Sequence, residues 1–193
     1  MLLVEPCFVC YRPIVELMHG VAVAIPTKEE NHFKLTAQEL REHITEKTKM
    51  LILPFPNNPT GGIMTREDLE QIADVLRETN IVVLSDEIYS EQTYGRKHCS
   101  IAELEGMQER TILVNGFSKS FAMTGWRLGF LAAPKPLCQQ MLKIHQYAIM
   151  CAPTVSQYAA ITALQTCDDE VQKMVHEYNV RRRMLVDLSL IHI

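Results

Sequence analysis

The chain has 193 residues, of which 47% are hydrophobic and 22% are charged, and its formal net charge is −4 at pH 7. This composition is typical of a globular domain, and the lack of a basic patch argues against nucleic acid as a partner. No stretch is long and apolar enough to span a bilayer, so no membrane is expected as a partner. Residues 1–4 lack the charged region and cleavage site of a signal peptide, and a cytoplasmic location is expected.

Six short apolar runs predict β-strands along the chain. They cover residues 2–4, 21–25, 50–53, 81–84, 111–114 and 129–132. Helical patterns lie between several of them, and Thr36 with Glu39 and Thr65 with Asp68 have the spacing of a capping box at a helix start. The predicted helices cover residues 36–44, 65–78, 136–150, 153–165 and 168–183.

This alternation of strands and helices predicts the fold class. Strands that alternate with helices are typical of an α/β fold with a mostly parallel sheet and helices on both of its faces. We therefore expect a three-layer αβα sandwich.

Polar motifs follow three of the predicted strands, at the point where each strand ends. Residues 57–62 (NNPTGG) follow the third strand, 85–90 (SDEIYS) follow the fourth, and 115–129 (NGFSKSFAMTGWRLG) follow the fifth. Each motif taken alone could be an ordinary turn. Ligands of open parallel sheets lie outside the carboxyl ends of the strands, so the three motifs together predict one shared binding site.

The third motif places Lys119 in an apolar turn punctuated by glycines. Its neighbours Phe117, Phe121 and Met123 are expected to desolvate the amine partly. Desolvation favours the neutral amine, which can condense with an aldehyde to a Schiff base. Arg127 offers a fixed fork of donors for phosphate oxygens. The motif therefore predicts a site for a carbonyl cofactor that carries a phosphate.

In their order and spacing, the three motifs resemble those of the fold-type I, pyridoxal-phosphate-dependent aminotransferases of class I/II. The resemblance extends over residues 1–183 and implies the central part of an aspartate aminotransferase-like large domain. By this resemblance, Lys119 carries the cofactor as a Schiff base and Asp86 pairs with the pyridine nitrogen. Tyr89 and Asn58 match the two donors to the phenolic oxygen.

The same resemblance gives three further cofactor contacts. Arg127 matches the arginine that binds the phosphate, and Phe8 falls where an aromatic ring stacks on the pyridine. Many relatives carry Ser or Thr three positions before the lysine, where its hydroxyl binds phosphate, but this chain has Gly116 there. Ser118 is a candidate to supply a hydroxyl instead.

The implied function is transfer of an amino group from an L-amino acid to a 2-oxo acid, with ping-pong kinetics. A role in amino-acid biosynthesis and a homodimeric full-length protein are expected with it. Two alternatives remain open: a pyridoxal-phosphate-dependent C–S β-lyase, which uses the same electron sink, and the cofactor-sensing domain of a transcriptional regulator.

The resemblance also implies a fold truncated at both ends. Residues 1–167 would be part of the large domain, and 168–193 a long helix that leads towards a small domain outside this chain. Residues 187–193 do not continue the family pattern and are interpreted as a non-native tail. We expect this fragment to be poorly soluble and inactive alone, because truncation exposes apolar faces.

Cys7 and Cys10 form a C-x-x-C pair, for which zinc or redox chemistry is the alternative to free thiols. The other four cysteines are isolated single residues, so a second pair of zinc ligands is lacking. We therefore expect free thiols and assign no metal site.

Overall fold

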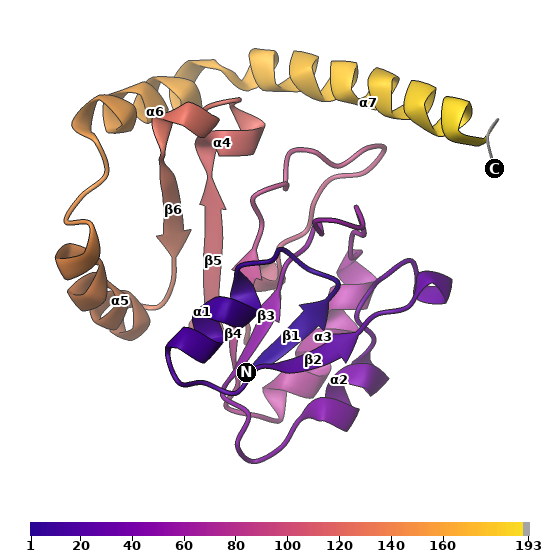
Figure 1. The fold of residues 1–193 in the computed structure, drawn as a ribbon, viewed down its shortest axis with the longest axis vertical. Coiled ribbons are helices and arrows are strands. Elements are labelled where there is room, and N and C mark those ends of the chain that lie inside the picture. Colours follow the sequence, from indigo (N-terminus) through magenta and orange to yellow (C-terminus); the bar gives the residue numbers. More distant parts are fainter. Residues whose placement is uncertain (191–193) are drawn as a thin grey trace.

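The structure is a computed structural model that describes residues 1–190, and its six strands form one sheet in the order β2-β1-β3-β4-β5-β6 (Figure 1). The strands are β1 Leu2–Glu5, β2 Val23–Pro26, β3 Met50–Leu53, β4 Val82–Asp86, β5 Thr111–Gly116 and β6 Gly129–Ala132. Strands β1 to β5 pair in parallel, and β6 pairs with β5 in the antiparallel sense. The mostly parallel sheet predicted from the sequence is confirmed.

Seven α-helices lie within the described residues. They are α1 Tyr11–Leu17, α2 Ala37–His43, α3 Arg66–Arg77, α4 Phe117–Ser120, α5 Lys135–Ala148, α6 Thr154–Thr166 and α7 Asp168–Leu190. Both predicted capping boxes are present, at Thr36 for α2 and at Thr65 for α3. The sequence did not predict α1, because this short helix has no side-chain cap at Cys10 and contains Pro13.

The last helix is longer than the sequence pattern predicted. Helix α7 continues past residue 183 to Leu190, so 187–190 extend it without a break. Residues 191–193 lie outside the described part of the chain. The interpretation of 187–193 as a non-native tail therefore stays a prediction.

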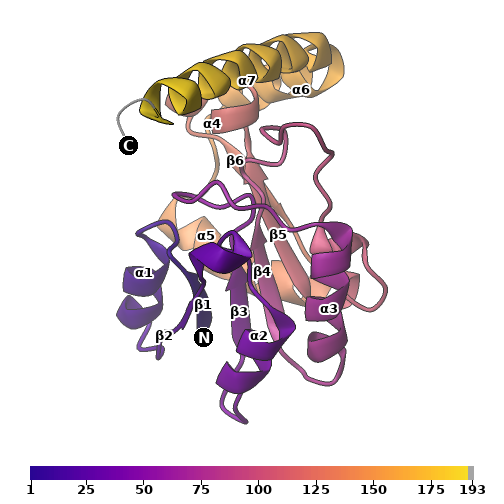
Figure 2. The same cartoon turned by 90° about the vertical axis from the view of Figure 1, so that its right-hand side faces the viewer.

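Helices cover both faces of the sheet, because successive strand side chains point to opposite sides. Leu51 and Leu53 of β3 belong to the cluster that contains Ile72 of α3. Ile52, between them, packs with Val15 of α1. Figure 2 shows α1 and α3 on opposite sides of β1 and β3, which is the layered arrangement expected for an αβα sandwich.

The end of the sheet at β6 is much less covered. All four residues of β6 are exposed, and α5 contains no buried residue. Ile144, Tyr147 and Ile149 are among the exposed apolar side chains of this region. Open apolar surface promotes association, which is the physical basis for the low solubility expected of this chain. None of the described helices combines the length and apolar character needed to cross a bilayer.

Truncation of Ile72 to alanine tests the packing of α3 on the sheet. Ile72 is 0% exposed, and Ile72→Ala is expected to lower the free energy of unfolding by about 2–5 kcal/mol, since a cavity remains in the core. Urea denaturation followed by circular dichroism measures the loss. Ile144→Ala, at a position that is 73% exposed on α5, is the control and should change stability by less than about 0.5 kcal/mol. Equal losses in the two variants would contradict this packing.

Candidate functional site

A cavity of about 380 Å³ lies where the carboxyl ends of β3, β4 and β5 meet. All seven site residues predicted from the sequence line it: Phe8, Asn58, Asp86, Tyr89, Ser118, Lys119 and Arg127. They come from four segments that are far apart in the sequence. The parallel sheet brings them together, since the carboxyl ends of its strands share one edge.

Asp86 ends β4, and both of its carboxylate oxygens have partners. Oδ1 accepts a hydrogen bond from the Ile88 amide at 3.1 Å, and Oδ2 accepts one from the Tyr11 hydroxyl. Burial, and then the charge of Asp86, raise the pKa of Tyr11, so its hydroxyl stays protonated and donates. Asp86 is therefore held in a fixed orientation at the cavity wall.

Tyr11 is a site residue that the sequence analysis missed. Its ring lies edge-on to Phe8, with 6.4 Å between the ring centroids, and it lines the same cavity. The sequence signal that could have predicted Tyr11 is its position three residues after Phe8, at the end of the segment that follows β1. That signal is weak without knowledge of α1, whose first residue is Tyr11.

Lys119 points into the cavity from α4 and is half-buried. Its Nζ lies 5.6 Å from the centroid of the Tyr89 ring. The sequence neighbours expected to desolvate it are wrong, because Phe117 and Met123 pack in a separate cluster with two alanines of α6. Residues two apart on a helix do not share a face, so Phe117 and Lys119 point in different directions. Apolar side chains from other segments, such as Ile88, line the cavity around the amine instead.

The turn after β3 is held by Asn57, which leaves the side chain of Asn58 at the cavity. Asn57 is buried; its Nδ2 donates to the Pro6 carbonyl at 3.1 Å, and its Oδ1 accepts from the Thr60 hydroxyl at 2.9 Å. Gly61 completes the turn with φ +71°, a region that favours glycine. The two neighbouring asparagines thus have different tasks, one in the turn and one in the site.

Arg127 supplies the positive charge at the outer part of the cavity. It is exposed, and its backbone has φ 52°, an unfavourable region for a residue with a side chain. Nη1 donates to the Thr124 carbonyl at 2.9 Å, and the Thr124 hydroxyl donates to the Ser118 carbonyl at 2.8 Å. Such strain persists where the surrounding structure fixes a functional geometry. Here the chain of contacts fixes Arg127 relative to Ser118.

The close approach of β5 and β6 explains the glycine three positions before Lys119. Gly116 pairs with Gly129 in the sheet. A Cβ on Gly116 would lie 3.1 Å from the Gly129 Cα and 3.2 Å from the Leu128 carbonyl oxygen. A serine or threonine at this position would therefore require the two strands to move apart.

The C-x-x-C pair beside the cavity does not have the features of a reactive thiol pair. Burial raises the pKa of both Cys7 and Cys10, which keeps the thiols protonated. Within the described residues, no group of three or more His, Cys, Asp or Glu side chains is arranged to hold a metal ion.

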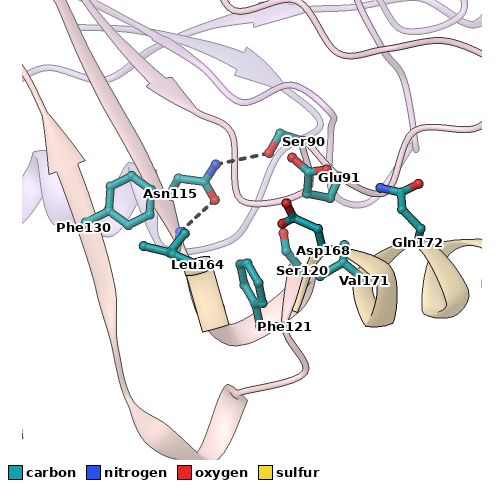
Figure 3. A pocket seen from close by; sticks show the side chains of 11 residues that line it. Ser90, Glu91, Asn115, Ser120, Phe121, Phe130, Leu164, Asp168, Val171 and Gln172 are labelled. Carbon is teal, nitrogen blue, oxygen red and sulfur yellow. Dashed lines mark hydrogen bonds between the residues drawn. The ribbon is translucent and has the colours of Figure 1, made fainter. Parts of the chain in front are cut away.

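A second cavity, of about 410 Å³, is lined by residues near the end of β5 and by the start of α7 (Figure 3). Glu91 and Asp168 are its charged lining residues, and both are acidic. Asn115 donates to the Ser90 hydroxyl at 3.2 Å within this cavity. Because a phosphate requires positive charge, the cavity that contains Arg127 is the better candidate for a phosphorylated ligand.

Comparison with known proteins finds similar sequences over nearly the whole chain. A family profile described as "Aminotransferase class I and II" matches residues 1–189. An aspartate aminotransferase of Pyrococcus abyssi is 50% identical over 190 residues, with 95% of this chain and 48% of the relative covered. An aromatic-amino-acid aminotransferase of Thermococcus litoralis is 49% identical over 190 residues, with the same coverage.

Solved structures are similar as well. An aromatic aminotransferase from Pyrococcus horikoshii superposes with a TM-score of 0.92 at 48% identity, over 95% of this chain and 50% of that one. An aspartate aminotransferase from Rhizobium meliloti gives a TM-score of 0.93 at 32% identity, over 96% of this chain and 47% of that one. This chain thus spans about half the length of the relatives it matches.

Proposed function

The chain belongs to the aminotransferase class I and II family, and from this premise we propose that it supplies the cofactor site of a pyridoxal 5′-phosphate-dependent aminotransferase. The enzyme would transfer an amino group from an L-amino acid to a 2-oxo acid by a ping-pong mechanism in which Lys119 carries the cofactor covalently. The convergence of Lys119, Asp86 and Arg127 on one cavity carries this proposal.

The side chains around the cavity fit this cofactor group by group. Asp86 offers a carboxylate to a protonated ring nitrogen, Arg127 offers a guanidinium to the phosphate, and Lys119 offers an amine to the aldehyde. Phe8 is 48% exposed, so its ring is available for stacking. The bound cofactor supplies an electron sink for the pair left behind when the substrate Cα loses its proton.

Asp86 has the role of keeping a proton on the ring nitrogen. An opposite charge within hydrogen-bond distance favours the protonated form of such a nitrogen. The hydrogen bonds from Tyr11 and from the Ile88 amide orient the carboxylate without neutralising it. We infer that Tyr11 acts through Asp86 as a positioning residue.

Tyr89 and Asn58 have the role of donors to the phenolic oxygen of the cofactor. Both are half-buried at the cavity wall. Donation to this oxygen favours its ionised form. Lys119, next to the Tyr89 ring, would accept the proton that the substrate Cα loses, since its amine is the basic group at that wall.

The phosphate would be held at the outer part of the cavity. Arg127 supplies the charge there, and Ser118, which lies half-buried beside Lys119, is the candidate hydroxyl donor. Gly116 has no hydroxyl to contribute.

Several properties of the whole protein are proposed on the same basis. We infer a homodimer, a cytoplasmic location and a role in amino-acid biosynthesis. Residues 1–167 would belong to the large domain, and α7 would lead to a second domain that contributes to substrate binding. Because about half of each relative lies outside the matched part, we expect this chain alone to be inactive.

The decisive assay adds an amino donor and 2-oxoglutarate to the full-length protein that contains this chain. Glutamate formation is expected, with parallel double-reciprocal lines when both substrates are varied, because the cofactor shuttles the amino group between two half-reactions. The control omits the 2-oxo acid. Pyruvate and ammonia released from a cysteine conjugate in that control would instead identify a C–S β-lyase, and intersecting lines would contradict the ping-pong order.

A further inference from the structure

Glu87 follows Asp86 directly, yet its side chain points to the opposite side of the strand end. The hydrogen bond between Ser85 and Glu87 places both side chains on one side of the chain, while Asp86, between them, points to the other side, as alternate residues of an extended chain do. Glu87 is 3% exposed. It is therefore a buried carboxylate next to the cavity that has no place in its lining.

Three donors surround the Glu87 carboxylate. Oε1 accepts from the Ser85 hydroxyl at 2.8 Å and from the Ser100 hydroxyl at 2.6 Å. Oε2 accepts from Nε2 of His98 at 2.8 Å. Both oxygens are thus used, and burial without such partners would be strongly unfavourable for this side chain.

These donors connect the two ends of one loop, residues 88–97, which we call the Tyr89 loop. Glu87 directly precedes this loop at the end of β4, whereas His98 and Ser100 follow the loop, where the chain returns towards the core. The loop contains Tyr89, which lines the cofactor cavity, and Ser90, which accepts a hydrogen bond from Asn115 (Figure 3). The Glu87 carboxylate therefore joins the two ends of the loop that carries Tyr89 at the proposed site.

We propose that Glu87 is a positioning residue. Its carboxylate holds the two ends of the Tyr89 loop together through three hydrogen bonds, which we call the clasp, and so fixes Asp86 and Tyr89 at the cofactor cavity. The part of this inference that concerns the cofactor rests on the proposed function. The clasp itself rests on the three hydrogen bonds.

The substitution Glu87→Gln isolates the acceptor role of the carboxylate. Glutamine has nearly the same size, but its amide nitrogen is a donor and cannot accept. In the wild-type protein, His98 donates to one carboxylate oxygen and the two serine hydroxyls donate to the other. Whichever of these oxygens becomes the amide nitrogen can no longer accept from its donors. The matched control is Glu91→Gln, because Glu91 is an exposed glutamate of the same loop and its side chain contacts no hydrogen-bond partner within the described residues.

Two measurements on the intact 193-residue chain test the proposal. In hydrogen–deuterium exchange, Glu87→Gln is expected to speed exchange of the Tyr89 loop by about tenfold, the effect of one lost hydrogen bond, while α3 stays unchanged. In a titration with pyridoxal phosphate, the same variant is expected to bind about tenfold more weakly. The pH midpoint of the bound cofactor's visible spectrum should rise, because the Tyr89 donor is displaced.

Each outcome decides one part of the proposal. Unchanged exchange of the loop in Glu87→Gln would overturn the clasp. Faster exchange with an unchanged spectral midpoint and unchanged cofactor affinity would overturn the positioning role and leave a purely structural one. If the wild-type chain binds no cofactor, the titration is repeated with the full-length protein that contains it. Lack of binding there would overturn the proposed function, and the exchange experiment decides the role of Glu87 in the loop in either case. If Glu87→Gln does not fold, His98→Leu removes only the donor at the partly exposed end and should give the same pattern.

Discussion

Replacement of Lys119 by alanine is expected to abolish covalent capture of pyridoxal phosphate. The wild-type protein should show a visible absorption band on titration with the cofactor, and borohydride reduction should fix the cofactor on Lys119. The variant lacks the amine that we propose to condense with the aldehyde and to move the substrate proton. Loss of proton transfer alone should lower kcat by about 10²–10⁴-fold. Absorbance, reduction and peptide mapping measure the capture, and glutamate formation by the full-length protein that contains this chain measures the rate.

Lys143→Ala is the matched control for this substitution. Lys143 lies on α5, is exposed, and donates to Gln140 at 3.0 Å. It is far from the cavity lining, so its removal should change neither the band nor the mapped peptide. A band that persists in Lys119→Ala, with the cofactor reduced onto a different lysine, would show that Lys119 is not the attachment site.

Asp86→Asn is expected to have the next largest effect, because it removes a charge while keeping the shape of the side chain. An adjacent carboxylate shifts the pKa of an opposite charge by about 1–3 units, so the protonated fraction of the ring nitrogen and the rate should fall by about 10–10³-fold. The nitrogen-15 chemical shift of labelled cofactor reports the protonation, and kcat/KM reports the rate. Tyr11 keeps an acceptor in the amide oxygen, so the fold around α1 should persist.

Asp74→Asn is the comparison for the loss of a carboxylate. Asp74 lies on α3, where it pairs with Arg77 at the exposed surface. Exposed ion pairs contribute little to stability, and no effect on the ring nitrogen is expected. A protonated ring nitrogen in Asp86→Asn would refute the assigned role of Asp86, even if the rate fell.

The sequence located the site because the relevant residues follow strands. The bounds predicted for β3 and β6 agree with the structure, and the helix starts at Thr36 and Thr65 carry the predicted caps. Once the sheet is parallel, its geometry brings the residues after β3, β4 and β5 to one edge. The strand pattern therefore predicted where the site lies, whereas the choice of Phe8, Asn58 and Ser118 depended on the resemblance to the family, and Tyr11 was missed.

Directions of side chains could not be obtained from the same patterns. Phe117 and Met123 pack against α6 and not beside Lys119: Phe117 lies on a different side of α4, and Met123 comes after this helix. Tyr11 meets Asp86 across 75 positions of sequence, through a helix with no start signal. Glu87 and His98 meet only because the Tyr89 loop returns to β4. Each of these contacts depends on tertiary structure that local spacing does not encode.

Because α7 is long, a small tilt at its start would produce a larger displacement further along the helix. Arg182 lies 14 positions after the first residue of this helix, which corresponds to about 21 Å at 1.5 Å per residue. Its guanidinium rests over the ring of Tyr94, 5.0 Å from the centroid, and such contacts hold to about 6 Å. A tilt of about 3° that carries α7 away would move Arg182 by about 1 Å, which reaches the limit of this contact. The contact between α7 and the loop that contains Tyr89 would therefore be sensitive to small changes in the direction of this helix.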